Sequence, residues 1–208
     1  MKMYKPKQMF WDDDLSDYED WVTEIKYDGE RNLLIIKDGE VKVQRHEGRI
    51  KTDHYPEIID YVKSTDLIKR NVILDGEICV LVNDIKADFP SIANRQTVNK
   101  EKQKTLLKTK PVTFVAFDIV ELDGDDTMEE AFGNRRKVLE SLNLSKIGDF
   151  KKNNVVIIKS AQCQDLWKLL ETIKEHDLEG AVMKNPKAYQ QMIKLKNYDE
   201  DEFEISGT

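Results

Sequence analysis

The stretch WVTEIKYDGERNLLIIK, residues 21–37, contains two strand-like runs separated by the turn dipeptide Asp28-Gly29. A second turn, Asp38-Gly39, leads into VKVQR at residues 41–45, so the chain is predicted to open with two hairpin-like units. Lys26 ends the first apolar-flanked strand, and Arg31 follows five residues later. This pattern places a lysine amine beside a tight turn, with a second cation close by.

The chemistry that such a lysine could serve is attack of its amine on a phosphorus atom. A free lysine has a pKa of about 10.4 and is protonated, so its amine is not nucleophilic. Partial burial and nearby cations, such as Arg31, a metal ion or another lysine, would lower that pKa. Gly29 would let the backbone approach a triphosphate without a Cβ in the way. The alternative is a plain hairpin turn with surface charges.

Outside this stretch, strand-like and helix-like segments are joined by tight turns. Pro56 marks the start of a helix in YPEIIDYVKS, and Asn134 is expected to cap the helix RRKVLESLN. Two more helices are predicted in FPSIANR and QDLWKLLETIKEH, with a lysine-rich loop after the first of them. Further strands are predicted in NVILDGEICVLV, with a bend at Asp75-Gly76, and in PVTFVAFDIV, VVIIKS, EGAVMK and QMIKLK. Strands outnumber helices, so we expect an α+β domain of antiparallel sheets flanked by helices.

Chain length, apolar runs and cysteine spacing limit the size of the core and the cellular compartment of the protein. The 208 residues can form one sizeable core, or one core with a small appendage. Apolar runs such as Leu33–Ile36 are far too short to cross a bilayer, and the first residues contain no stretch suited to secretion. Cys79 and Cys163 lie far apart without the spacing of metal ligands. We therefore expect a non-secreted protein that is cytoplasmic, or associated with the nucleoid or with viral replication, and has no membrane partner.

The net charge of −7 argues against nucleic acid as a partner, but the distribution of charge is uneven. One basic cluster is NKEKQKTLLKTK, which includes Lys102, Lys104 and Lys108, and a second is Arg135-Arg136-Lys137. Each cluster either contacts phosphate groups or is a solvated charged face.

Six elements in a fixed order connect these observations. They are Lys26-x-Asp28-Gly29-x-Arg31, then Arg45, Leu74-Asp75-Gly76-Glu77, Phe114–Asp118, Glu179–Lys184 and Lys194-Leu195-Lys196. This order resembles the covalent nucleotidyltransferases, which comprise DNA ligases, RNA ligases and mRNA-capping enzymes. It is most similar to the adenylation domain of ATP-dependent DNA ligases, over roughly residues 20 to 205.

The resemblance implies a nucleotidyltransferase (ATP-grasp-like) core in which Lys26 attacks the α-phosphate of ATP and carries AMP. It also implies contacts to ATP from other residues: Glu24 at the adenine edge, Phe117 and Val182 on the two faces of adenine, Arg31 and Arg45 at ribose or phosphate, Glu77 at the ribose hydroxyl, and Lys194 and Lys196 at the α-phosphate. Glu77 and Glu179 are implied as ligands of Mg²⁺. Nicked double-stranded DNA is the expected partner, contacted by Arg45, Arg95, Lys102 and Lys104.

The expected reaction has three steps: AMP passes from ATP to Lys26, then to a 5′-phosphate at a nick, and a 3′-hydroxyl finally displaces it. ATP is favoured over NAD as the AMP donor. We expect a monomer with an adenylation domain over residues 1–202, and FEISGT, residues 203–208, as the start of an oligonucleotide-binding-type barrel. The alternatives are an RNA ligase, a capping-type enzyme with the same lysine chemistry, or a non-catalytic nucleic-acid-binding relative.

Overall fold

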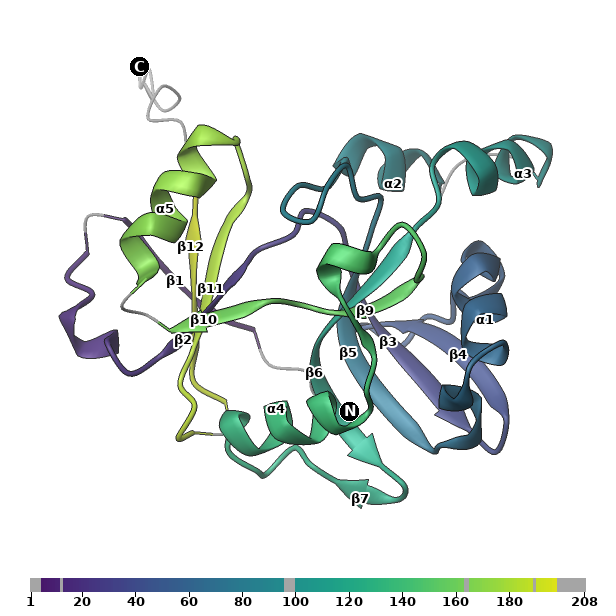
Figure 1. The fold of residues 1–208 in the computed structure, drawn as a ribbon, viewed down its shortest axis with the longest axis horizontal. Helices are drawn as coiled ribbons and strands as arrows, with labels where there is room; N and C mark the ends of the chain where they lie inside the picture. The colour runs from purple at the N-terminus through teal and green to yellow at the C-terminus, as the bar shows by residue number, and fades with distance from the viewer. Residues whose placement is uncertain (1–4, 12, 96–99, 163–164, 189, 198–208) are drawn as a thin grey trace, which may run out of the picture.

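The computed structural model describes residues 5–11, 13–95, 100–162, 165–188 and 190–197, which form two β-sheets with helices around them (Figure 1). The first sheet has the strand order β1 (Lys7–Met9), β12 (Met192–Lys196), β11 (Gly180–Lys184), β2 (Val22–Ile25) and β10 (Ser160–Gln162). The second has the order β4 (Glu40–Arg45), β3 (Glu30–Lys37), β5 (Val72–Cys79), β6 (Thr113–Leu122), β9 (Val155–Ile157) and β8 (Ser145–Lys146), with β7 (Asp125–Asp126) paired to β6.

This arrangement confirms the predicted α+β class, with sheets flanked by helices. Most strand pairs are antiparallel, as expected, but β1–β12, β6–β9 and β8–β9 are parallel, so both sheets are mixed. The pairs β1–β12 and β6–β9 arise where a long connection returns the chain to the sheet in its original direction. A helix lies in the connection between β6 and β9, as is usual for parallel neighbours.

The helices cover the two sheets separately (Figure 1). Helix α5 (Leu166–Glu175) packs Leu166, Leu170 and Ile173 against the first sheet. Around the second sheet lie α1 (Pro56–Lys63), α2 (Phe89–Arg95), α3 (Lys100–Thr109) and α4 (Phe132–Ser141). Short 3₁₀ turns occupy Ser16–Tyr18, Thr52–His54, Asp66–Lys69 and Ile147–Asp149. Among the described residues, none of the helices has the length and apolar character needed to cross a membrane.

Two of the local predictions are wrong. The lysine-rich segment predicted to be a loop is helix α3, because lysine, glutamine, glutamate and leucine are all good helix formers. Asn134 does not cap α4, which begins at Phe132 without a side-chain cap. The start of α4 is instead tied to a distant loop, since the amides of Phe132 and Gly133 donate to the carbonyls of Ala188 and Pro186, both at 2.9 Å.

The first predicted hairpin is also wrong. Strands β2 and β3 belong to different sheets, so residues 26–29 carry the chain from one sheet to the other rather than reversing it. Gly29 is required there by close packing. A Cβ on Gly29 would lie 2.5 Å from the carbonyl oxygen of Ile78 and 2.9 Å from Sγ of Cys79, both on β5. The predicted bend at Asp75-Gly76 is confirmed, because the register of β5 against β6 shifts between these two residues.

A third hydrophobic cluster, comprising Tyr27, Cys79, Val115, Ile147, Val156 and Ile158, joins these crossing residues to the second sheet. Partly buried Ile25 of β2 and Phe117 of β6 pack against it. This cluster therefore fixes how the crossing segment sits on the sheet. The site described below lies at the same junction.

Replacing Gly29 by alanine should destabilise the fold, because the neighbouring backbone of β5 cannot move aside without disturbing the sheet. We expect the free energy of unfolding to fall by about 1–3 kcal/mol, the usual cost of overpacking. Urea unfolding followed by circular dichroism measures this. Gly148→Ala is the matched control, since its Cβ would meet no atom within 4 Å. Equal stability of the two variants would contradict the packing argument.

Candidate active site

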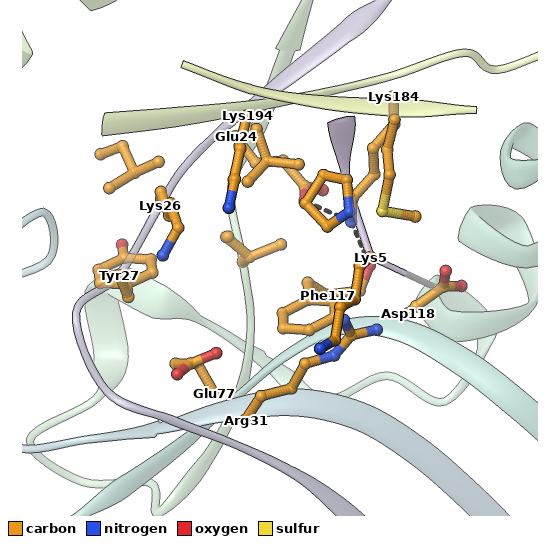
Figure 2. A pocket seen from close by; sticks show the side chains of 15 residues that line it. Lys5, Glu24, Lys26, Tyr27, Arg31, Glu77, Phe117, Asp118, Lys184 and Lys194 are labelled. Carbon is orange, nitrogen blue, oxygen red and sulfur yellow. Dashed lines mark hydrogen bonds and ion pairs between the residues drawn. The ribbon is translucent and has the colours of Figure 1, made fainter. Parts of the chain in front are cut away.

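A pocket of about 270 Å³ lies between the two sheets, beside the end of β2 and the two residues that follow it (Figure 2). Its volume is close to the lower end of small-molecule sites, about 300–1,000 Å³. The first sheet contributes residues of β2, β11 and β12, and the second contributes residues of β3, β5 and β6. The lining residues are Lys5, Pro6, Glu24, Ile25, Lys26, Tyr27, Arg31, Glu77, Phe117, Asp118, Ile158, Val182, Lys184, Met192 and Lys194.

Lys26 stands at one end of the pocket. Its amide donates to the carbonyl oxygen of Gly180 at 2.8 Å, which anchors the backbone to the residue where β11 begins. Its ammonium group forms an ion pair with the carboxylate of Glu179, and Nζ of Lys196 lies 3.9 Å from the same carboxylate oxygen. Two lysines and one carboxylate are thus gathered beside the chain crossing.

Glu77 projects from β5 toward this end of the pocket, facing Lys26 (Figure 2). Burial raises the pKa of the Glu77 carboxyl to about 8; the charge of Lys26 opposes this rise and the charge of Glu179 adds to it. A carboxyl with such a pKa is protonated over much of the neutral range, unless a bound cation compensates its charge.

Phe117 forms the floor of the middle of the pocket (Figure 2). Val182 of β11 also lines the pocket, from the first sheet. The guanidinium carbon of Arg31 lies 5.4 Å from the centre of the Phe117 ring, within the range of a cation–π contact. Nε and Nη2 of Arg31 donate to the two oxygens of Asp75 at 3.0 and 2.6 Å. Asp75 therefore fixes how Arg31 enters the pocket.

Glu24 occupies the opposite end, where it is only 2% exposed. Nζ of Lys184 lies 2.6 Å from its carboxylate, Oγ of Ser160 donates to it at 2.7 Å, and Nη1 of Arg136 lies at 3.3 Å. The Lys184 ammonium also lies 4.8 Å from the centre of the Phe117 ring. This end of the pocket is a buried cluster of one carboxylate and two cations.

The structure brings most of the predicted nucleotide residues together. Seven of them line the pocket: Glu24, Lys26, Arg31, Glu77, Phe117, Val182 and Lys194. Lys194 and Lys196 lie on one face of β12, as their alternation predicts, because Ile193 and Leu195 are buried on the other face. Lys196 and Glu179 are not part of the pocket lining, but both lie near the Lys26 ammonium.

Arg45 is not brought to the pocket. Its Nε lies 2.9 Å from Glu30 and 3.1 Å from Glu47. The Glu30 carboxylate also accepts a hydrogen bond from the hydroxyl of Tyr55 at 2.8 Å. Arg45 thus takes part in a buried polar cluster of the second sheet.

The residues predicted to contact DNA fall into two groups. Lys104 and Lys108 are exposed on α3, whereas the side chain of Lys102 lies outside the part of the chain that is described. Arg95 is 2% exposed and forms an ion pair with Glu57, so the structure contradicts a phosphate contact for it. A charge this deeply buried requires a partner, and Glu57 supplies one from α1.

Sequence reasoning gave no role to Lys184 or Asp118, which both line the pocket. For Lys184 a signal was present, because residues two apart on a strand share a face and Lys184 follows Val182 by two. The basic run Arg135-Arg136 was expected either to contact phosphate groups or to be a solvated charged face, but both arginines turn inward to Asp118 and Glu24. Their partners are remote in sequence, so no local pattern indicated this.

The carboxylates of Glu179 and Glu77 near Lys26 could hold a divalent cation. Oε2 of Glu179 is buried without a hydrogen-bond partner, and Glu77 is close enough for the two carboxylates to influence each other electrostatically. An oxygen of this kind suits a hard cation such as Mg²⁺. Among the described residues there is no cluster of three or more acidic, histidine or cysteine ligands, so further oxygens would have to come from water or phosphate.

The arrangement of the two sheets is that of the nucleotidyltransferase domains of ATP-dependent ligases. The structure titled mycobacterial DNA ligase D complexed with ATP and MES matches with a TM-score of 0.68 at 23% identity, covering 93% of this chain and 60% of that one. The ligase domain of Mycobacterium tuberculosis LigD matches with a TM-score of 0.65 at 22% identity, covering 93% and 60%. At these identities the matches establish the fold.

Sequence comparison establishes the family. Residues 12–197 match the family described as ATP dependent DNA ligase domain, and the chain belongs to that family. Bacillus subtilis LigD, a bifunctional non-homologous end joining protein, is 30% identical over 205 residues, covering 90% of this chain and 33% of the relative. The SPbeta prophage-derived DNA ligase-like protein LigB of B. subtilis is 28% identical, covering 91% and 66%. The chain thus spans between a third and two thirds of the length of these relatives.

Proposed function

We propose that this chain is the catalytic core of an ATP-dependent DNA ligase and that Lys26 carries AMP. The observation that supports this best is the position of the Lys26 ammonium. It stands at the mouth of a pocket with an aromatic floor, a buried acceptor at the far end and further cations beside it. Membership in the ATP-dependent DNA ligase family gives the reaction that such a lysine would perform.

In the first step, Nζ of Lys26 would form an N–P bond to the α-phosphorus of ATP while the P–O bond to pyrophosphate breaks. Pyrophosphate leaves with the electron pair of that bond, and the proton lost from Nζ passes to a nearby base, for which the contacting carboxylate of Glu179 is well placed. Lys194 and Lys196 would offset the charge of the α-phosphate, because fixed cations stabilise phosphoryl transfer electrostatically.

AMP would then pass from Lys26 to the 5′-phosphate at a DNA nick, where the N–P bond breaks and a pyrophosphate linkage forms. The 3′-hydroxyl across the nick would attack that 5′-phosphorus and release AMP, which seals the strand. Glu77 and Glu179 would hold Mg²⁺, which when bound neutralises phosphate charge. Phe117 and Val182 would stack on adenine, with Glu24 at its edge and Glu77 near the ribose.

The first test addresses covalent AMP. Lys26→Ala should abolish labelling of the protein by ATP carrying a radiolabelled α-phosphate, and Lys26→Arg should do the same because a guanidinium stays protonated. Intact-mass spectrometry of the purified proteins with ATP and Mg²⁺ checks the result, and circular dichroism checks that they are folded. Lys42→Ala, a half-exposed lysine on β4, is the control that keeps labelling. AMP attached to the Lys26→Ala protein would rule out this assignment.

A second test addresses the base. Phe117→Leu keeps much of the apolar volume but removes the aromatic face, which is worth about 1–3 kcal/mol per stacked base. The Kd for ATP, measured by calorimetry, should therefore rise by about tenfold or more. Phe114→Leu on the same strand is the control: Phe114 is fully buried in the core and outside the pocket, so stability should fall without a change in ATP affinity. The opposite pattern would make Phe117 a core residue only.

A third test addresses the partner. Lys104→Gln combined with Lys108→Gln removes two exposed charges of α3, so affinity for a nicked DNA duplex should fall. The slope of log K against log salt should become shallower by up to about 2, roughly 0.9 for each lost phosphate contact. Lys151→Gln with Lys152→Gln is the matched control on another exposed turn. An unchanged slope would mean that α3 is only a solvated face, and tighter binding to a nicked RNA duplex would favour an RNA ligase.

A further inference from the structure

Helix α4 presents two consecutive arginines to the pocket rather than to solvent. Nε and Nη2 of Arg135 donate to the two oxygens of Asp118, both at 2.8 Å, and Nη1 of Arg136 lies 3.3 Å from Glu24. Asp118 and Glu24 both line the pocket. A basic run that looks like a surface patch in sequence is therefore a pair of internal contacts to pocket carboxylates.

The Glu24 carboxylate is held from three directions by three separate elements. Lys184 of β11 contacts Oε2, while Ser160 of β10 and Arg136 of α4 both contact Oε1. Strand pairing supports two of these contacts, since Glu24 is opposite Ser160 in one register, and in the other Lys184 is opposite Val22, two residues before Glu24 on the same face of β2. Arg136 is the exception, because it comes from a helix outside the first sheet.

Arg136 is itself held in place. Its Nη2 donates to the carbonyl oxygen of Ile158 at 2.8 Å, and its Nε donates to Glu140 at 3.0 Å, one turn along α4. Ile158 also lines the pocket. The planar guanidinium thus joins α4, the end of the second sheet and Glu24, a geometry that the single ammonium of a lysine cannot reproduce.

This arrangement determines what Glu24 can offer to a ligand. A carboxylate has about four lone-pair positions, and three donors leave one acceptor position. Because the group is buried, a base edge that carries an amino donor would satisfy that position. A base with a carbonyl oxygen there would place two acceptors against each other. Holding the Glu24 carboxylate in this orientation therefore makes the pocket selective for a base with an amino group at that edge over a base with a carbonyl oxygen there.

We propose that Arg136 and Ser160 are positioning residues that hold Glu24 as an acceptor for the amino group of a purine, and so set the preference of the site for ATP. This inference rests on the proposed function, because it concerns the nucleotide that the same pocket would bind. Helix α4 would thus take part in base selection, although most residues that line the pocket come from the strands of the two sheets.

The experiment compares ATP with purine riboside triphosphate, which has the same ring system without the amino group, in calorimetric titrations of the full chain. The wild type should prefer ATP. Arg136→Gln should weaken ATP binding by about tenfold, the value of a charge-assisted hydrogen bond, and leave binding of the purine riboside nucleotide unchanged. Arg136→Lys, which keeps a cation, should restore part of the ATP affinity. Lys137→Gln, an exposed neighbour on α4, should retain the full preference.

A merely structural role would appear as an equal loss of affinity for both nucleotides, and that result would overturn the inference. If Arg136→Gln does not fold, Ser160→Ala decides the question, because it removes only one hydroxyl from Oε1 of Glu24; an unchanged preference for ATP in that variant also overturns the inference. Wild-type protein that binds both nucleotides equally would refute base selection by Glu24 and leave the proposed function standing. Wild-type protein that binds neither would refute the proposed function itself.

Discussion

The close packing of the chain where it crosses between the sheets is the constraint on which the rest of the site depends. Gly29 lies against the backbone of β5, and the amide of Lys26 is bonded to the carbonyl oxygen of Gly180. Gly180 has a φ of +147°, and a Cβ there would lie 2.0 Å from the carbonyl oxygen of Leu195. At Gly29 and Gly180 a side chain would clash with neighbouring backbone, so both glycines are needed for the close packing of the segment that contains Lys26. Most of the other pocket residues are then placed by the strands to which they belong.

The positions of most strands and helices follow from local sequence signals. Strand-like runs bounded by turn dipeptides predicted β3 and β4, and Pro56 correctly marked the start of α1. The Asp28-Gly29 turn was misassigned because a turn dipeptide predicts a break in a strand, but it does not say which sheet the next strand joins. That choice is made by tertiary contacts with β5, which lies about fifty residues further along the chain.

For the site, the ordered motifs predicted the residues on strands better than those on helices. Lys26, Glu77 and Phe117 belong to three separate motifs, and the strands bring these motifs to one pocket; the roles of the three residues stay predictions. Arg95 and Arg136 were misjudged as surface cations. Their burial is made possible by carboxylates that are distant in sequence, Glu57 and Glu24, and a pattern of nearby residues contains no information about such partners.

The ion pair between Lys26 and Glu179 has a consequence for any anionic ligand. The Lys26 ammonium already has a counter-ion, so an incoming phosphate must take the place of a carboxylate to pair with it. When a phosphate binds at this end, Lys26 exchanges the Glu179 carboxylate for the phosphate. The free energy of this step is the difference between the attraction of Lys26 to the phosphate and its attraction to Glu179. Such a site stays stable while it is empty, and it gains most from a ligand that arrives with its own cation to receive the displaced carboxylate.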